Sequence, residues 1–172
     1  MNFLIETERL ILRNIKPEDL EGFYELDSDP EVHRYLGNEP VTDRMVLAKV
    51  IDHVIGQYEE FGIGRWAVVE KSSNEFAGWC GLKYIAEAAH HPNPYYDLGY
   101  RLIRRHWGRG YATEAGRASL DYGFRQLDLN EIYAAAHPEN EASNHILLKL
   151  GFSRLGSFME HGSNNNWYVL KK

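Results

Sequence analysis

The sequence predicts a mixed α/β fold, and three features of the chain support this class. A long run with the period of an amphipathic helix occupies residues 42–61. Three β-prone runs then follow one another between residues 65 and 103, with only a turn and a polar loop between them. Beyond residue 108, helical and extended runs alternate to the C-terminus, as in strand–helix–strand units.

The first half of the chain is expected to form one strand and then helices. Residues 8–13 are β-prone, and Pro17-Glu18-Asp19 supplies the proline and the acidic residues that open a helix. A break at Asp29-Pro30 precedes a second short helix over residues 31–36. Thr42-Asp43 can cap the long helix, which we expect to end at Tyr58 or Phe61 and to lay its apolar stripe on a sheet.

The second half of the chain is expected to be richer in strands. In chain order we predict strands over 66–70, 76–85 and 95–103, a helix from 108 to about 127, a strand over 131–137, a helix over 141–150 closed by Gly151, and strands over 152–160 and 167–170. One side of the long helix carries only small residues: Ala112, Gly116, Ser119 and Gly123. This helix can therefore lie close to the sheet.

Length and composition limit the class of protein. At 172 residues with 44% hydrophobic content, the chain is long enough for one domain, which we expect to span residues 1–172. Its net charge of −6 argues against a nucleic-acid-binding protein. The single cysteine, Cys80, excludes an internal disulfide and fits a reducing cytosol. No signal peptide is visible and no apolar run has the roughly 20 residues of a membrane span, so we expect a cytoplasmic protein with no membrane partner.

The segment 107–115 is the strongest functional feature of the sequence. Gly108 and Gly110 lie where a predicted strand gives way to a helix, so backbone N–H groups at the positive end of a helix dipole can hold a phosphate there. A Rossmann site would need a third glycine at the position of Thr113, and a P-loop would need a Gly-Lys-Ser/Thr run that the chain lacks. Both nucleotide sites are therefore excluded.

Two interpretations of this segment remain. A solvated basic turn would account for Arg104, Arg105 and Arg109, but it explains the glycines less well. A pyrophosphate held by backbone N–H groups explains both features, with the arginines adding attraction. The donors would be the N–H groups of Gly108, Arg109, Gly110, Ala112 and Thr113.

Three motifs occur in a fixed order along the chain: TERLILR at residues 7–13, LGY with GRGYATEA at 98–100 and 108–115, and NEAS with KLGF at 140–143 and 149–152. Together they resemble the GNAT superfamily of acyl-CoA-dependent N-acetyltransferases, in particular the RimJ/RimL-like branch that acetylates ribosomal-protein N-termini and related amines. The resemblance covers nearly the whole chain. It implies a central, mostly antiparallel, twisted sheet of about six or seven strands, with splayed strands at the acyl-CoA site and helices on both faces.

The resemblance also implies that acetyl-CoA is the co-substrate and that its pyrophosphate binds the glycine segment. Trp107 stands where the family usually has Arg or Gln, which should not abolish binding because the donors are backbone N–H groups. The strand end Leu102-Ile103-Arg104 is expected to pair with the pantetheine arm, and the Leu102 N–H is expected to polarise the thioester carbonyl. Asn140 is expected to hydrogen-bond the arm, and it can also be the N-cap of the following helix.

Catalysis needs a base for the amine and a proton or hydrogen-bond donor for the departing CoA thiolate. By resemblance, Asp97 occupies the position of the family's usual glutamate base, and Glu160 is a second candidate of nearly equal rank. The family's usual tyrosine acid falls on Leu147, so Ser143 is the candidate replacement. The alternatives are that Asp97 is only a polar residue at a strand start and that Ser143 is only a hydrogen bonder at a helix end.

The expected function is transfer of an acetyl group from acetyl-CoA to a primary amine by direct attack. The acceptor would be a protein N-terminus or a small-molecule amine, and it would enter between residues 33–37 and the loop 86–96. His90 and His91 in that loop lack a clear third ligand, so no metal site is predicted. The alternative function is a non-catalytic acyl-CoA-binding or sensing module, which the missing tyrosine at position 147 favours. No nucleic-acid partner is expected, and a homodimer is left open.

Overall fold

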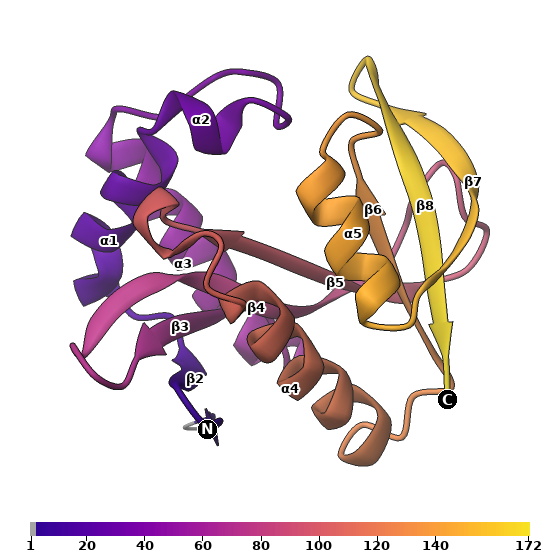
Figure 1. The fold of residues 1–172 in the computed structure, drawn as a ribbon, viewed down its shortest axis with the longest axis horizontal. Helices are drawn as coiled ribbons and strands as arrows, with labels where there is room; N and C mark the ends of the chain where they lie inside the picture. Colours follow the sequence, from indigo (N-terminus) through magenta and orange to yellow (C-terminus); the bar gives the residue numbers. More distant parts are fainter. Residues whose placement is uncertain (1–2) are drawn as a thin grey trace.

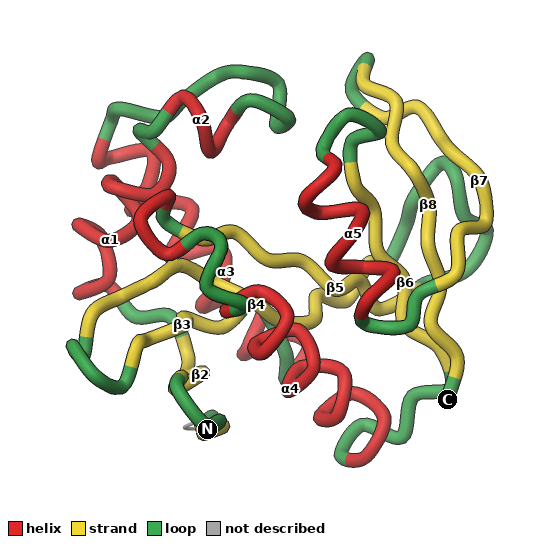
Figure 2. The backbone as a smooth tube through the Cα atoms, in the orientation of Figure 1, coloured by secondary structure: helices red, strands yellow, loops and turns green. Residues whose placement is uncertain are grey.

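The computed structural model describes residues 3–172, which form an eight-stranded sheet with helices on both faces (Figures 1 and 2). The strands are β1 (Leu4–Glu6), β2 (Leu10–Asn14), β3 (Trp66–Glu70), β4 (Glu75–Ile85), β5 (Tyr95–Leu102), β6 (Glu131–Ala136), β7 (Ser153–Glu160) and β8 (Ser163–Lys171). The helices are α1 (Leu20–Asp27), α2 (Pro30–His33), α3 (Arg44–Phe61), α4 (Tyr111–Arg125) and α5 (Glu141–Lys149), with 3-10 turns at Pro17–Asp19 and Arg104–His106. The strand order is β1-β2-β3-β4-β5-β6-β8-β7, and β5 and β6 are the one parallel pair among these strands.

The predicted mixed α/β class and the mostly antiparallel sheet are confirmed, but the strand count exceeds the expected six or seven. The added strand, β1, has only 3 residues, which is too short to show a β period in the sequence. β8 begins at Ser163 instead of residue 167, because pairing with β7 draws a polar run into the sheet. α2 ends at His33 instead of residue 36, since the N–H groups of Leu36 and Asn38 fold back onto the His33 carbonyl.

Helix caps explain two further boundaries. The Asp43 carboxylate accepts a hydrogen bond from the Met45 N–H (2.8 Å) and opens α3 at the predicted place. In contrast, α4 begins at Tyr111 and not at residue 108, because Gly108 and Gly110 both have positive φ angles and lie outside the helix.

The two faces of the sheet carry separate layers. α4 and α5 lie on one face, where Leu98, Ala115 and Leu147 belong to the main core. α1 and α3 cover the other face, where Phe23 and Ile51 pack in a second cluster. Figure 1 shows α4 crossing in front of β4 and β5. Because both faces of the central strands are covered, the edge of β5 toward β6 is the part of the sheet that can admit a ligand.

β5 and β6 separate from each other along their length. β5 pairs with β4 at eight positions, from Ile85↔Tyr95 to Gly78↔Leu102. Within residues 3–172, its ladder with β6 contains the single pair Asp97↔Tyr133. Figure 1 shows β6 and β8 running at a steep angle to β4 and β5. The expected splay is thereby confirmed, and it opens a gap beside the C-terminal half of β5.

Among the helices of residues 3–172, none combines the length and the apolar character that a membrane crossing requires.

Candidate active site

The loop before α4 leaves the first turn of this helix uncapped. Gly110 is the N-cap, with φ +79° and ψ 8°, and it supplies no side-chain cap, whereas Asp43 and Asn140 cap α3 and α5. The first hydrogen bond of α4 runs from the Glu114 N–H to the Gly110 carbonyl (3.0 Å). The N–H groups of the three residues between them therefore lie at the positive end of the helix dipole, where an anion is stabilised.

Both glycines of this loop border open space. A Cβ atom built on Gly108 would meet no heavy atom within 4 Å, and one built on Gly110 would meet only Nη2 of Arg9, at 3.4 Å. A diphosphate can approach the backbone closely at such positions because no side chain stands in the way. The residues present therefore fit a pyrophosphate, with Ala112 and Thr113 half-buried in the adjoining helical turn.

The first motif of the sequence holds this loop in place. The Arg9 guanidinium donates from Nε to Glu114 Oε2 (2.7 Å) and from Nη1 to the Arg109 carbonyl (2.8 Å). The Thr7 hydroxyl donates to Glu114 Oε1 (2.6 Å). The segment between β1 and β2 thus fixes both the loop and the first turn of α4, although it is about 100 residues away in the chain.

Each arginine near the loop is paired with a carboxylate. The pairs are Arg104 with Asp29 (3.3 Å), Arg105 with Glu25 and with Glu75 (3.6 Å), and Arg109 with Glu70 (2.7 Å). These carboxylates offset the positive charge that was expected to attract a phosphate. Binding at the loop consequently depends on the backbone N–H groups more than on the arginine side chains.

Glu70 of β3 anchors the two residues that flank Gly110. It accepts hydrogen bonds from the hydroxyls of Ser73 (2.6 Å) and Tyr111, and it forms the ion pair with Arg109. The hydroxyls of Ser73 and Tyr111 and the charge of Arg109 lower the pKa of Glu70 to about 2. Glu70 therefore remains ionised, and keeps its ion pair with Arg109, at neutral and mildly acidic pH.

The end of β5 directs its backbone toward the gap. The Ile103 N–H donates to the Ala77 carbonyl of β4 (2.9 Å), and N–H groups alternate sides along a strand. The N–H groups of Tyr100 and Leu102 therefore face away from β4, toward β6. The Leu102 carbonyl accepts a hydrogen bond from Nε1 of Trp107 (2.7 Å), so this indole ties the loop to the strand end. Ile103, by contrast, packs beside Leu26 and is only 3% exposed.

The start of α5 lies across the gap and carries the predicted Asn140 and Ser143. The Asn140 Oδ1 accepts a hydrogen bond from the Ser143 N–H (3.1 Å), so Asn140 is the N-cap of α5. The Ser143 hydroxyl lies 2.9 Å from the hydroxyl of Tyr100, which projects from β5. Leu147, at the position of the family's usual tyrosine, is 1% exposed and belongs to the core.

Tyr100 is the residue of this site that sequence reasoning missed. Its position two residues before Leu102 places both side chains on the same face of β5, which is the face that α4 and α5 cover. That spacing was visible in the sequence. The contact with Ser143 was not, because it joins residues 43 positions apart.

Asp97 is bound to an arginine. Its carboxylate pairs with the Arg65 guanidinium, which also donates to the Asp97 and Gly81 carbonyls (both 2.6 Å). Gly99 leaves room for this guanidinium, since a Cβ there would lie 2.6 Å from its Nη2. Burial raises the pKa of Asp97 and the charge of Arg65 opposes that shift. Five residues of extended strand place Asp97 about 16 Å from Leu102.

Glu160 ends β7 with an exposed side chain. Among residues 3–172, no cation lies within ion-pairing distance of its carboxylate. Burial is the main cause of the raised pKa of Asp97, and the negative charge of Glu160 adds to it. The same charge opposes the lowering of the His90 pKa by burial. The His90 ring stacks on Phe158 of β7, with 3.7 Å between centroids. Both candidate carboxylates thus lie toward the loop 86–96, and Glu160 is the one with free access to solvent.

Comparison with known proteins identifies the family to which this fold, with its gap between two splayed strands, belongs. The sequence profile described as "Acetyltransferase (GNAT) domain" matches residues 9–153. The chain is 36% identical over 155 residues to the uncharacterized N-acetyltransferase p20 of Bacillus licheniformis, a match that covers 90% of this chain and 85% of that protein. The chain belongs to the GNAT family and is an acetyl-CoA-dependent acyltransferase.

Two further similarities bear on the branch of the family. The spermidine N(1)-acetyltransferase of Escherichia coli (strain K12) is 32% identical over 158 residues, which cover 91% of this chain and 80% of that protein. The crystal structure of RimL, a ribosomal L7/L12 alpha-N-protein acetyltransferase, superposes with a TM-score of 0.80 over 100% of this chain and 96% of that one, at 18% identity. The second match shows a shared fold with the RimJ/RimL-like enzymes.

Proposed function

We propose that this enzyme transfers an acetyl group from acetyl-CoA to a primary amine, either a small-molecule amine or a protein N-terminus. One arrangement carries the proposal: α4 begins with an uncapped first turn, and the Leu102 N–H, which precedes it in the chain, faces away from β4 toward the gap beside β5. Such a site can hold the pyrophosphate at one end and a thioester carbonyl at the other. Acetyl-CoA, the co-substrate of this family, supplies the acetyl group as a reactive thioester.

The chain's own residues then have the following roles. The N–H groups of the loop and of the first α4 turn hold the pyrophosphate: Gly108, Arg109, Gly110, Ala112 and Thr113. Leu102 donates its N–H to the thioester carbonyl, and Trp107 keeps the strand end in place by binding the Leu102 carbonyl. Asn140 uses its Oδ1 as a helix cap, which leaves its Nδ2 to pair with the pantetheine arm. The Ser143 hydroxyl donates a hydrogen bond to the departing sulfur.

We assign the base to Glu160. A primary amine with a pKa of about 10 is almost wholly protonated near neutral pH and must lose a proton before it attacks. The Asp97 carboxylate is already paired with the Arg65 guanidinium, so it is poorly suited to take that proton. Glu160 is exposed and free of an ion pair within residues 3–172, so it can accept the proton directly or through water.

The acceptor is proposed to be a cationic amine, with polyamines tested first. The net charge of −6 favours approach of a cation, and one relative over most of the chain is named as a spermidine N-acetyltransferase. Protein N-termini are tested in parallel, since the fold is shared with an N-terminal acetyltransferase. Amino acids and antibiotic amines complete the set.

The experiment incubates the purified chain with acetyl-CoA and this panel of amines. Release of the CoA thiol is followed with a colour reagent, and the acetylated product is identified by mass spectrometry. We expect at least one primary amine to raise thiol release well above the rate with water alone. If acetyl-CoA binds in calorimetry but no amine raises thiol release, the chain is a non-catalytic acyl-CoA-binding module and the proposal is wrong.

A further inference from the structure

The contact between Tyr100 and Ser143 joins the two halves of the protein across the gap. The Tyr100 hydroxyl lies 2.9 Å from Ser143 Oγ, where either oxygen can be the donor, and 3.1 Å from the Ser143 carbonyl, which can also accept the phenol proton. Tyr100 belongs to β5, and Ser143 belongs to the first turn of α5, which packs on β6. Ser143 is the residue proposed to donate a hydrogen bond to the sulfur of CoA. The Tyr100 phenol therefore approaches it from the opposite wall of the site.

Both partners are fixed in position. Tyr100 pairs with Cys80 in the continuous ladder between β4 and β5. The first turn of α5 is held by Asn144, whose Nδ2 donates to the His137 carbonyl (2.9 Å) and the Asn140 carbonyl (2.8 Å). Two hydrogen-bonded walls thus bring the two hydroxyls together, and their distance does not depend on a flexible loop.

The serine hydroxyl has few other constraints. Among residues 3–172, Tyr100 is the only side chain that hydrogen-bonds Ser143 Oγ. A free serine hydroxyl samples three staggered rotamers, and its proton rotates as well. The phenol has one proton, which either the Ser143 carbonyl or Ser143 Oγ can accept. In the arrangement in which the phenol donates to Oγ, the proton of Ser143 is left free to point into the gap, and polarisation by the phenol strengthens the hydrogen bond that this proton makes.

The phenol acts as a donor and does not give up its proton. Burial is the main reason that the pKa of Tyr100 is raised above its usual value of 10.0, so the group stays neutral throughout the working range of an enzyme. A relay that left a buried tyrosinate behind would therefore be unfavourable. This is consistent with a residue that orients Ser143.

We propose that Tyr100 is a positioning residue that aims the Ser143 hydroxyl at the sulfur of the acyl donor, an inference that rests on the proposed function of Ser143. The phenol reaches the first turn of α5 from β5, while Leu147, one turn further along this helix, is buried in the core.

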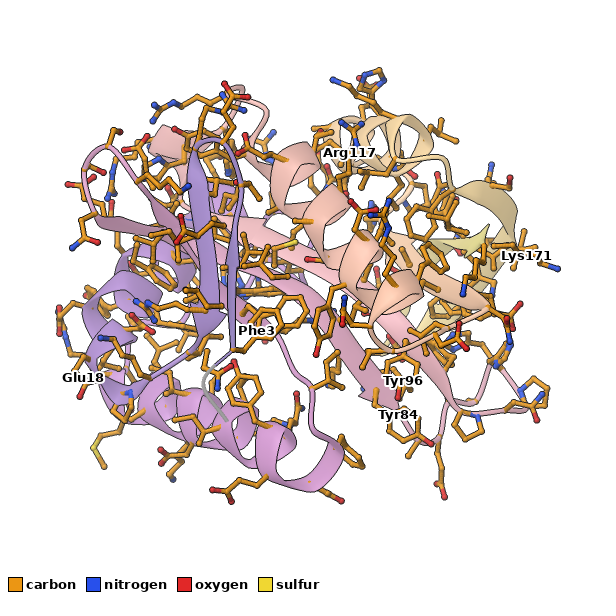
Figure 3. The ribbon with its side chains drawn as sticks, turned by 90° about the horizontal axis from the view of Figure 1, so that it is seen from below. Phe3, Glu18, Tyr84, Tyr96, Arg117 and Lys171 are labelled. Atoms are coloured by element: carbon orange, nitrogen blue, oxygen red, sulfur yellow. The ribbon has the colours of Figure 1, made fainter. Side chains whose placement is uncertain are left out.

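The test compares Tyr100→Phe, Ser143→Ala and the double variant. Tyr84→Phe is the matched control, because it removes a phenol from the neighbouring strand β4, where its ring lies against Tyr96 (5.3 Å between centroids), as Figure 3 shows. For each variant kcat and the KM for acetyl-CoA are measured by thiol release, together with the melting temperature. Should Tyr100→Phe fail to fold, Tyr100→His takes its place in the comparison.

We expect Tyr100→Phe to lower kcat roughly five- to tenfold, the effect of one lost hydrogen bond, with the KM for acetyl-CoA within about twofold of wild type. In the Ser143→Ala background the same substitution should have no further effect, and Tyr84→Phe should leave kcat unchanged. An equal loss of kcat in both backgrounds would mean that Tyr100 is merely structural. A wild-type kcat for Tyr100→Phe would overturn the inference about Tyr100 and leave the proposed function of Ser143 standing. A wild-type kcat for Ser143→Ala would instead remove Ser143 from the proposed function and the inference with it.

Discussion

Replacing Gly110 by glutamate puts a side chain and a negative charge at the N-cap of α4, where the pyrophosphate is proposed to bind. The backbone of Gly110 (φ +79°, ψ 8°) is left-handed, a conformation that costs an L residue about 1–2 kcal/mol. A carboxylate at a helix N-terminus recovers about 0.3–1 kcal/mol through the dipole. The free energy of unfolding should therefore fall by about 0–2 kcal/mol, and the melting temperature by roughly 0–8 °C for a chain of this length.

The effect on acetyl-CoA binding should be larger. A carboxylate about 4 Å from a phosphate charge costs about 1 kcal/mol in water and about 4 kcal/mol at an effective dielectric constant of 20. Since each 1.4 kcal/mol is about tenfold in Kd, the affinity of Gly110→Glu for acetyl-CoA should fall roughly 5- to 1000-fold. The new carboxylate also competes for the N–H groups that would bind the pyrophosphate.

Gly62→Glu is the matched control for this change. Gly62 is also left-handed (φ +69°, ψ 4°), and a Cβ there meets nothing within 4 Å, but it ends α3 away from the loop. It should carry a similar backbone strain and leave affinity unchanged, while Gly110→Ala separates strain and size from charge. Titration calorimetry at fixed ionic strength measures Kd, and circular dichroism measures unfolding. A folded Gly110→Glu protein with a Kd within twofold of wild type would refute the pyrophosphate site.

Three further predictions concern the base, the loop anchor and the missing tyrosine. Glu160→Gln should lower kcat about 100-fold with little change in the KM for acetyl-CoA. Asp97→Asn should chiefly lower the melting temperature. A larger loss of kcat in Asp97→Asn than in Glu160→Gln would assign the base to Asp97. The pKa of Glu70 is lowered from 4.5 to about 2, so its stabilising effect is present above pH 4.5 and is lost as the pH falls toward 2. Glu70→Gln should accordingly destabilise the protein in urea at pH 7 more than at pH 3, and an equal loss at both values would contradict the ion-pair role. Leu147→Tyr should overpack the core, because the side chain at 147 is 1% exposed and belongs to the main core. We expect it to lower stability by about 1–3 kcal/mol in urea unfolding and to leave kcat no higher than wild type. A gain in kcat would show that this position still faces the donor.

Most of the fold could be predicted from local patterns. The long helix α3 and the hairpin of β3 and β4 carry strong periodicity and clear turn or cap residues, and they appear within a few residues of the expected bounds. β1 and the first half of β8 could not be predicted, since a strand of 3 residues and a strand rich in asparagine are stabilised by their neighbours and not by their own sequence.

The candidate site also has features that the sequence predicted and features that only the tertiary structure showed. The sequence alone determined the loop of Gly108 and Gly110, because positive φ angles and an uncapped helix start require glycines at fixed spacing, and the resemblance of its motifs identified the family. Only the tertiary structure decided that the nearby arginines are paired with carboxylates, that Asp97 is bound to Arg65, and that Tyr100 meets Ser143. Each of these contacts joins residues far apart in the chain, and a side chain's partner depends on how the strands and helices pack, which no local pattern encodes.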